Sequence, residues 1–172
     1  MNLLNTRAIV LFGCLLSLLS PAATRTWVGG QPGNSWHDPA NWDAGVVPGP
    51  ADEIIVPQEN AILEITADAT ASTLSLTPGA SIVAVGPNAR IRVAGSVIVD
   101  GAVLRSEDGG QVDLPQADRF EAGLVAIRGP GSVALPNLRL FDHSSVELPA
   151  GASWAPPSGA TSMLFEVPRA TA

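Results

Sequence analysis

Between residues 59 and 149 the sequence is a succession of very short segments in which apolar and polar residues alternate, and this pattern constrains the fold most strongly. A period of two is typical of strands that bury one face. The apolar positions are mostly Val, Leu, Ile and Ala. Most segments contain only two or three of them. The sequence therefore predicts an all-β domain of many short strands, with no helix longer than two turns after residue 23.

Residues that favour turns separate these segments. Gly and Pro number 17 and 15 in the chain, and with Asn and Asp they provide the backbone conformations that tight turns need. Such turns are Pro78-Gly79, Gly86-Pro87-Asn88, Ala94-Gly95, Asp100-Gly101, Asp108-Gly109-Gly110, Gly129-Pro130-Gly131, Pro136-Asn137 and Pro149-Ala150-Gly151. Strands that begin about every 8–11 residues are typical of sandwiches, barrels and solenoids.

The shortness of the strands favours a solenoid. Strands with so few inward residues would give a sandwich a thin core, whereas a solenoid stacks the aliphatic side chains of each coil on those of the next. We predict a short right-handed β-solenoid of about four or five rungs, each of roughly 20–25 residues. The alternative is a β-sandwich of about seven to nine strands. The predicted inward residues are Leu76, Val85, Val93, Val99, Leu114, Ile127 and Leu135.

Residues 1–23 have the features of a signal peptide. A short start with Arg7 as its single side-chain charge precedes an apolar run over residues 8–19, and small residues follow at 20–23. This run is shorter than the ~20 residues of a membrane-spanning helix. The predicted cleavage is after Ala22, with Ala23 as a close second. An uncleaved anchor or a buried helix is the alternative, and lipidation at Cys14 is disfavoured because the apolar run continues past it.

Charge and cysteine content narrow the classes of partner and chemistry. The chain has 9 basic and 16 acidic residues, a formal net charge of −7, and no Lys. This balance argues against nucleic acids and anionic membrane surfaces, because both attract basic patches. Cys14 is the only cysteine. A chain processed near Ala22 therefore has no disulfide and no thiolate metal site.

Residues 24–57 differ from the strands that follow, because they are rich in Trp, Gly, Pro and Asn. Three of the four Trp residues of the chain fall within 16 positions. The motif consists of Trp27, Gly29, Trp36, Asn41, Trp42, Gly45, Pro48 and Asp52, followed by the apolar run 54–56. This segment immediately precedes the predicted rungs.

The motif resembles the opening module of bacterial secreted β-solenoid proteins, the passengers that carry autotransporter-associated strand repeats. Its second half also resembles the start of a G8 domain, in which a Gly-x-x-Pro-x-x-x-Asp turn leads into a strand, a Pro and a second strand. Here these are Gly45, Pro48, Asp52, residues 54–56, Pro57 and residues 62–65. The resemblance covers about 40 residues and implies a solenoid architecture. It does not extend to a C-terminal membrane barrel, so self-transport is not predicted.

The three clustered indoles allow two interpretations. As an N-terminal cap, Trp27, Trp36 and Trp42 would cover the end of the solenoid core, which needs protection from edge-to-edge association. Asn41 and Asp52 would then hydrogen-bond turn backbone. Alternatively, the three indoles form a ligand-binding platform for sugar rings. The partner would then be an extracellular polysaccharide or a cell-surface component.

No residue pattern predicts a catalytic site or a cofactor. His37 and His143 are far apart in sequence, and Asp142-His143-Ser144 are neighbours in one turn that do not converge as a triad does. The carboxylates Glu107, Asp108, Asp113, Asp118 and Glu121, with Arg105, Arg119 and Arg128 nearby, lack the spacing of calcium loops. Glycoside cleavage needs two acids at a defined separation. We therefore expect that the protein is not an enzyme and that it holds no metal and no cofactor.

These observations divide the chain into a signal peptide at 1–23, a Trp-rich cap at 24–57, rungs at 58–155 and an irregular tail at 156–172. The predicted protein is secreted, periplasmic or on the cell surface, and it does not insert into a membrane once the signal is removed. Its expected function is a structural, surface-display or adhesion role. Carbohydrate binding is the alternative, and a remnant of a polysaccharide-degrading enzyme is a weaker one.

Overall fold

The computed structural model describes residues 21–29 and 33–149. Outside them lie residues 1–20 of the predicted signal peptide, which include Cys14, and the predicted tail. Trp154 also lies outside them. The described residues form fifteen strands and one 3-10 helix. They are β1 (Thr24–Thr26), η1 (Pro39–Asn41), β2 (Glu53–Val56), β3 (Ile62–Ile65), β4 (Asp68–Ala71), β5 (Thr73–Leu76), β6 (Ser81–Val85), β7 (Arg90–Val93), β8 (Val97–Ile98), β9 (Val103–Glu107), β10 (Gln111–Asp113), β11 (Arg119–Glu121), β12 (Leu124–Arg128), β13 (Ser132–Ala134), β14 (Leu140–Asp142) and β15 (Ser145–Glu147).

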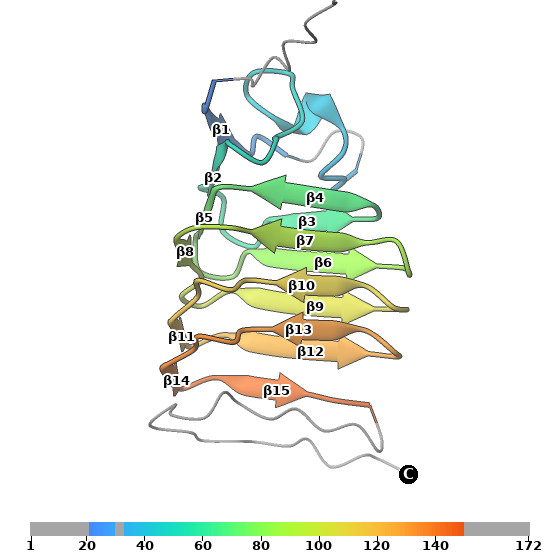
Figure 1. Cartoon of the computed structure of the whole chain (residues 1–172), viewed down its shortest axis with the longest axis vertical. Helices are drawn as coiled ribbons and strands as arrows, with labels where there is room; N and C mark the ends of the chain where they lie inside the picture. The colour runs from blue at the N-terminus through green and yellow to red at the C-terminus, as the bar shows by residue number, and fades with distance from the viewer. Residues whose placement is uncertain (1–20, 30–32, 150–172) are drawn as a thin grey trace, which may run out of the picture.

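The strands stack in parallel along the long axis of the molecule (Figure 1). One sheet has the order β15-β12-β9-β6-β3 and a second has the order β13-β10-β7-β4. The third face consists of the sheet β1-β2-β5-β8 and the pair β11-β14. The five-stranded sheet has one strand from each coil, so the described residues make about five turns. The predicted β-solenoid is confirmed, because the strands of a sandwich are antiparallel.

Residues in register stack their side chains inside the coils. Leu63, Ile82, Leu104, Val125 and Val146 occupy one such column and are buried. The second sheet contributes the buried column Ala69, Ile91, Val112 and Val133. Near the last coil, Phe120 and Phe141 stack with ring centroids 5.6 Å apart. Short strands therefore suffice because each inward residue packs on the coils above and below it.

Most of the predicted inward residues are confirmed. Leu76, Val93, Val99, Leu114 and Leu135 are buried in the core, and Ile127 is partly buried against it.

The prediction for Val85 was wrong. Val85 pairs in register with Glu107 on the outer face, while its neighbour Ala84 is buried. The run from Ile82 to Val85 is apolar at every position, so alternation did not specify which residues point inward.

Two strands gave no clear signal in the sequence. Strand β4 buries only Ala69 and Ala71, which are too small to mark an apolar stripe. Strand β11 buries Phe120 between charged neighbours.

Strand β2 pairs in parallel with β5, so the first coil begins within residues 24–57, the region that the sequence assigned to the cap. In the described part of the chain, no helix is long and apolar enough to cross a membrane.

Candidate functional site

The Trp-rich segment closes the upper end of the first coil. Strand β1 pairs in parallel with β2, and Ser35 forms a parallel bridge with Glu64 in β3. The Trp36 N–H donates to the Glu64 carbonyl at 2.8 Å, and the Glu64 N–H donates to the Asn34 carbonyl at 2.7 Å. Two of the three faces thus gain an extra strand-like partner at this end. These contacts satisfy backbone groups that an open end would leave free.

The three indoles of this segment pack on one another. Trp42 makes edge contacts with Trp27 and Trp36, at centroid distances of 5.1 and 4.9 Å. Its Nε1–H donates to the Trp36 carbonyl at 2.8 Å. The exposed fractions of Trp27, Trp36 and Trp42 are 2%, 0% and 2%. A sugar ring needs an exposed indole face, so this burial favours the cap over the sugar platform.

The Trp-x-Gly spacing has a steric cause. Gly29 has a φ of +50°, in the left-handed region where residues with a Cβ are strained. A Cβ at Gly29 would also collide with the Trp27 indole. Gly29 therefore allows the chain to turn directly against this ring.

Asn41 and Asp52 fix the turns around the indoles, as the cap hypothesis predicts. The Asn41 side-chain amide donates to the carbonyls of Ser35 at 2.9 Å and Gly33 at 3.2 Å. The Asp52 carboxylate accepts from the N–H groups of Gly49 at 2.9 Å and Ala23 at 3.0 Å. Asn41 and Asp52 are buried, and the Asn41 amide NH₂ group and the Asp52 carboxylate pair this irregular backbone.

The histidines do not join a triad within the described residues. His143 is exposed in a turn, with its Nδ1 3.0 Å from the Asp142 carboxylate. The neighbouring Ser144 hydroxyl donates to the Asp142 carbonyl at 2.8 Å and accepts from the Gly123 N–H at 3.1 Å. His37 lies in the Trp-rich segment, where its backbone N–H donates to the Ser35 hydroxyl at 3.2 Å.

Several of the candidate carboxylates form ion pairs on the outer faces. Asp113 lies 3.2 Å from Arg90 and 3.6 Å from Arg92. Glu107 pairs with Arg105 and Arg128, and Glu121 pairs with Arg119. Asp108 adopts a φ of +50° in its turn. In the ranges that the structure describes, no group of three metal-ligating side chains comes together.

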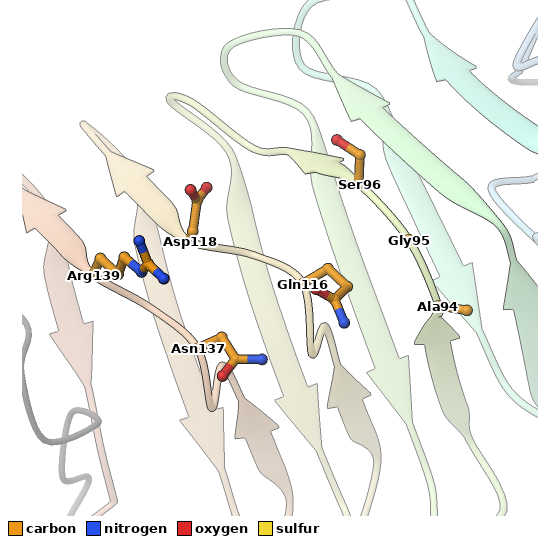
Figure 2. Close-up of a pocket in the computed structure, with 7 residues that line it drawn as sticks. All are labelled: Ala94, Gly95, Ser96, Gln116, Asp118, Asn137 and Arg139. Carbon is orange, nitrogen blue, oxygen red and sulfur yellow. The ribbon is translucent and has the colours of Figure 1, made fainter.

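An open recess in the described part of the molecule lies at the corner that joins two of the faces (Figure 2). It is open, has a volume of about 710 Å³, and spans the connections β7–β8, β10–β11 and β13–β14. The residues that line it are Ala94, Gly95, Ser96, Gln116, Asp118, Asn137 and Arg139. A Cβ at Gly95 would lie 2.6 Å from the Ser72 carbonyl oxygen, so backbone forms this wall.

Arg139 and Asp118 distinguish this recess from the rest of the surface. Six of the seven arginines in the described ranges form ion pairs, and Arg139 is the exception. The Asp118 carboxylate likewise has no ion pair within the described residues. Arg139 lies beside Asp118 in the next coil, and its backbone N–H donates to the backbone carbonyl of Asp118 at 2.8 Å. The recess thus offers one free guanidinium, one free carboxylate, two amides and a hydroxyl. The sequence marks Asp118 as a candidate acid but contains no pattern that places it beside Arg139.

Comparison of the chain with protein-family models, with curated proteins and with solved structures gives no match.

Proposed function

We propose that this chain is an exported, non-enzymatic β-solenoid module with a structural, surface-display or adhesion role. The observation that carries the proposal is the continuous stack of coils closed at one end by the three buried indoles. With rungs ~4.8 Å apart, about five coils give a rod roughly 20 Å long. The arginines that pair with acids on its outer faces leave a polar surface. Such a rod separates or presents what it is attached to.

Export is tested by the mass of the protein recovered outside the cytoplasm. The residues at positions 20–23 predict a mature N-terminus at Ala23 or Thr24. We expect intact-mass spectrometry of the periplasmic and culture fractions of a Gram-negative expression host to show one of these two species. The variant Leu15→Arg, which places a charge in the apolar run, serves as the control and should remain unprocessed. A protein that keeps Met1 in every fraction would contradict export.

Carbohydrate binding remains the second candidate, at the corner recess and not at the indoles. The recess holds one free positive and one free negative side chain, so a polar ligand without net charge, such as a sugar, complements it. Its amides and hydroxyl offer donors and acceptors to sugar hydroxyl groups. The spacing of the rungs is close to the length of one pyranose ring. A neutral glycan strand lying along the solenoid axis would thus meet equivalent positions in successive coils.

The recess is tested by calorimetric titration with cellohexaose, mannohexaose and chitohexaose. We expect at least one of them to bind, and Arg139→Ala to weaken that binding about tenfold or more, because a charged hydrogen bond contributes about 1.5–3 kcal/mol. Arg119→Ala is the matched control, since Arg119 is exposed nearby but is paired with Glu121 and does not line the recess. Lack of binding by all three sugars, or equal losses in the two variants, would argue against this site.

A further inference from the structure

We propose that the Ala22–Ala23 bond is the processing site, and that the α-ammonium group released at Ala23 docks on the buried carboxylate of Asp52. The inference rests on the proposed export for the cleavage step. Docking itself is a property of the folded protein. The sequence allows cleavage after Ala22 or after Ala23, and this inference selects the first of these positions. It also assigns Asp52 as the acceptor of the new chain terminus.

The ordered hydrogen bonding of the first coil begins at Ala23. The Ala23 N–H donates to Asp52 Oδ1 at 3.0 Å, and the Ala23 carbonyl accepts from the Glu53 N–H at 2.9 Å. Ala23 is half-buried, whereas Pro21 and Ala22 are exposed. Strand β1 then continues in register along β2, with Thr24 beside Glu53. Among the residues that the structure describes, Ala23 is thus the first whose backbone N–H and carbonyl are both hydrogen-bonded.

The carboxylate that faces Ala23 is prepared for a positive charge. Asp52 is 5% exposed, and its Oδ2 accepts from the Gly49 N–H at 2.9 Å and from Arg25 Nε at 3.3 Å. Burial acts to raise the pKa of Asp52, but the hydrogen bonds from Gly49 and Ala23 and the Arg25 guanidinium outweigh it, so the pKa lies below its usual value. The carboxylate is therefore charged at neutral pH.

The other charged groups near this end already have partners. The Glu53 carboxylate accepts from the Thr24 hydroxyl at 3.1 Å, and the Asp43 carboxylate accepts from the Thr26 N–H at 3.2 Å. Arg25 already pairs with Asp52 through Oδ2. Oδ1 of Asp52 is thus the acceptor that the Ala23 nitrogen meets.

Cleavage changes the donor at this position from neutral to charged. A signal peptidase adds water across the Ala22–Ala23 bond, so Ala22 leaves with a carboxylate and the Ala23 amine takes up a proton. Because the Asp52 acceptor is already charged, this hydrogen bond is charge-assisted before cleavage, and the ammonium group adds the Coulombic attraction of a full positive charge. Cleavage after Ala23 would instead remove both the donor to Oδ1 and the acceptor for Glu53. A buried acceptor without its donor is destabilising.

The docked amine gives a pH dependence with a definite sign. A carboxylate partner raises the pKa of the α-amine in the folded state above its unfolded value of about 7.7–8.0. The added stability is complete below that value and is lost as the pH rises through the folded-state pKa. Asp52 acts in the opposite direction, because its lowered pKa makes its contribution disappear in acid.

The test compares chains 23–172, 24–172 and 21–172, each released from a fusion by a protease that leaves no extra residue. At pH 6 we expect the folding constant of 23–172 to exceed that of 21–172 at least about fivefold, and the excess to vanish near pH 10. The chain 24–172 should be less stable than both. The chain has no Lys, so acetylation modifies a single amine, and acetylated 23–172 should lose the excess.

Asp52→Asn gives the matched control. In this background 23–172 and 21–172 should be equally stable, and acetylation of the α-amine should become faster than in the parent at pH 7. If Asp52→Asn does not fold, acetylation of the parent 23–172 still removes the charge while keeping the N–H. Equal stability of 23–172 and 21–172 at pH 6, or an excess that survives acetylation, would overturn docking. A secreted species that begins at Thr24 would overturn the processing site, whereas one that retains Met1 would refute export alone.

Discussion

Replacement of Val93 by Asp is expected to destabilise the solenoid strongly at neutral pH. Val93 is fully buried and lies in register beside Ala71 of the preceding coil. The core around it is aliphatic, so the new carboxylate would have no partner and would have to be buried as an ion or take up a proton. The expected cost is at least about 4–5 kcal/mol, a large part of the ~5–15 kcal/mol of a typical domain. Circular dichroism and urea denaturation would measure it.

Ile98→Asp is the matched control for Val93→Asp. Ile98 is also β-branched and lies in the adjacent strand β8, but it points outward and is 55% exposed. Its replacement should change the free energy of unfolding by less than about 0.5 kcal/mol. Melting of the Val93→Asp variant within a degree or two of the parent would show that the assigned register of β7 is incorrect.

Replacement of Trp42 by Ala is expected to destabilise the protein by about 3–5 kcal/mol. Trp42 is the central ring of the cap, since it contacts both Trp27 and Trp36 and also bridges to Trp27 through the backbone. Its loss would leave a cavity above the first coil and loosen the segments that lie on β2 and β3. The exposed strand edges would then favour association end to end. Thermal melting and size-exclusion chromatography would report the two effects.

Trp42→Phe separates the packing of the ring from its hydrogen bond. Phe retains an aromatic ring but not the Nε1–H that donates to the Trp36 carbonyl. We expect an intermediate loss that includes about 1–3 kcal/mol for the unpaired carbonyl. A Trp42→Ala variant that keeps the parent's melting temperature and remains monomeric would show that the indoles do not cap the solenoid.

The alternation of residues and the turns determined the class of fold. Two or three inward residues in each strand, separated by Gly, Pro, Asn and Asp, predicted stacked short strands, and the parallel sheets confirm this prediction. The Trp-rich segment precedes the rungs in the sequence, and in the structure it pairs with β2 and β3 of the first coil. The roles of Asn41 and Asp52 followed from their types, because buried amides and carboxylates in turns pair with backbone.

The tertiary structure decided the features that depend on which residues of different coils lie side by side. The apolar run from Ile82 to Val85 fits either register, and only pairing with β9 turned Val85 outward. Strand β4, with alanines as its inward residues, and the stack of Phe120 on Phe141 likewise required neighbouring coils. The same holds for the approach of Arg139 to Asp118 and of Ala23 to Asp52. Local alternation specifies the face of a strand, but contacts between residues some twenty or more positions apart are set by the parallel register between coils, which no local pattern encodes.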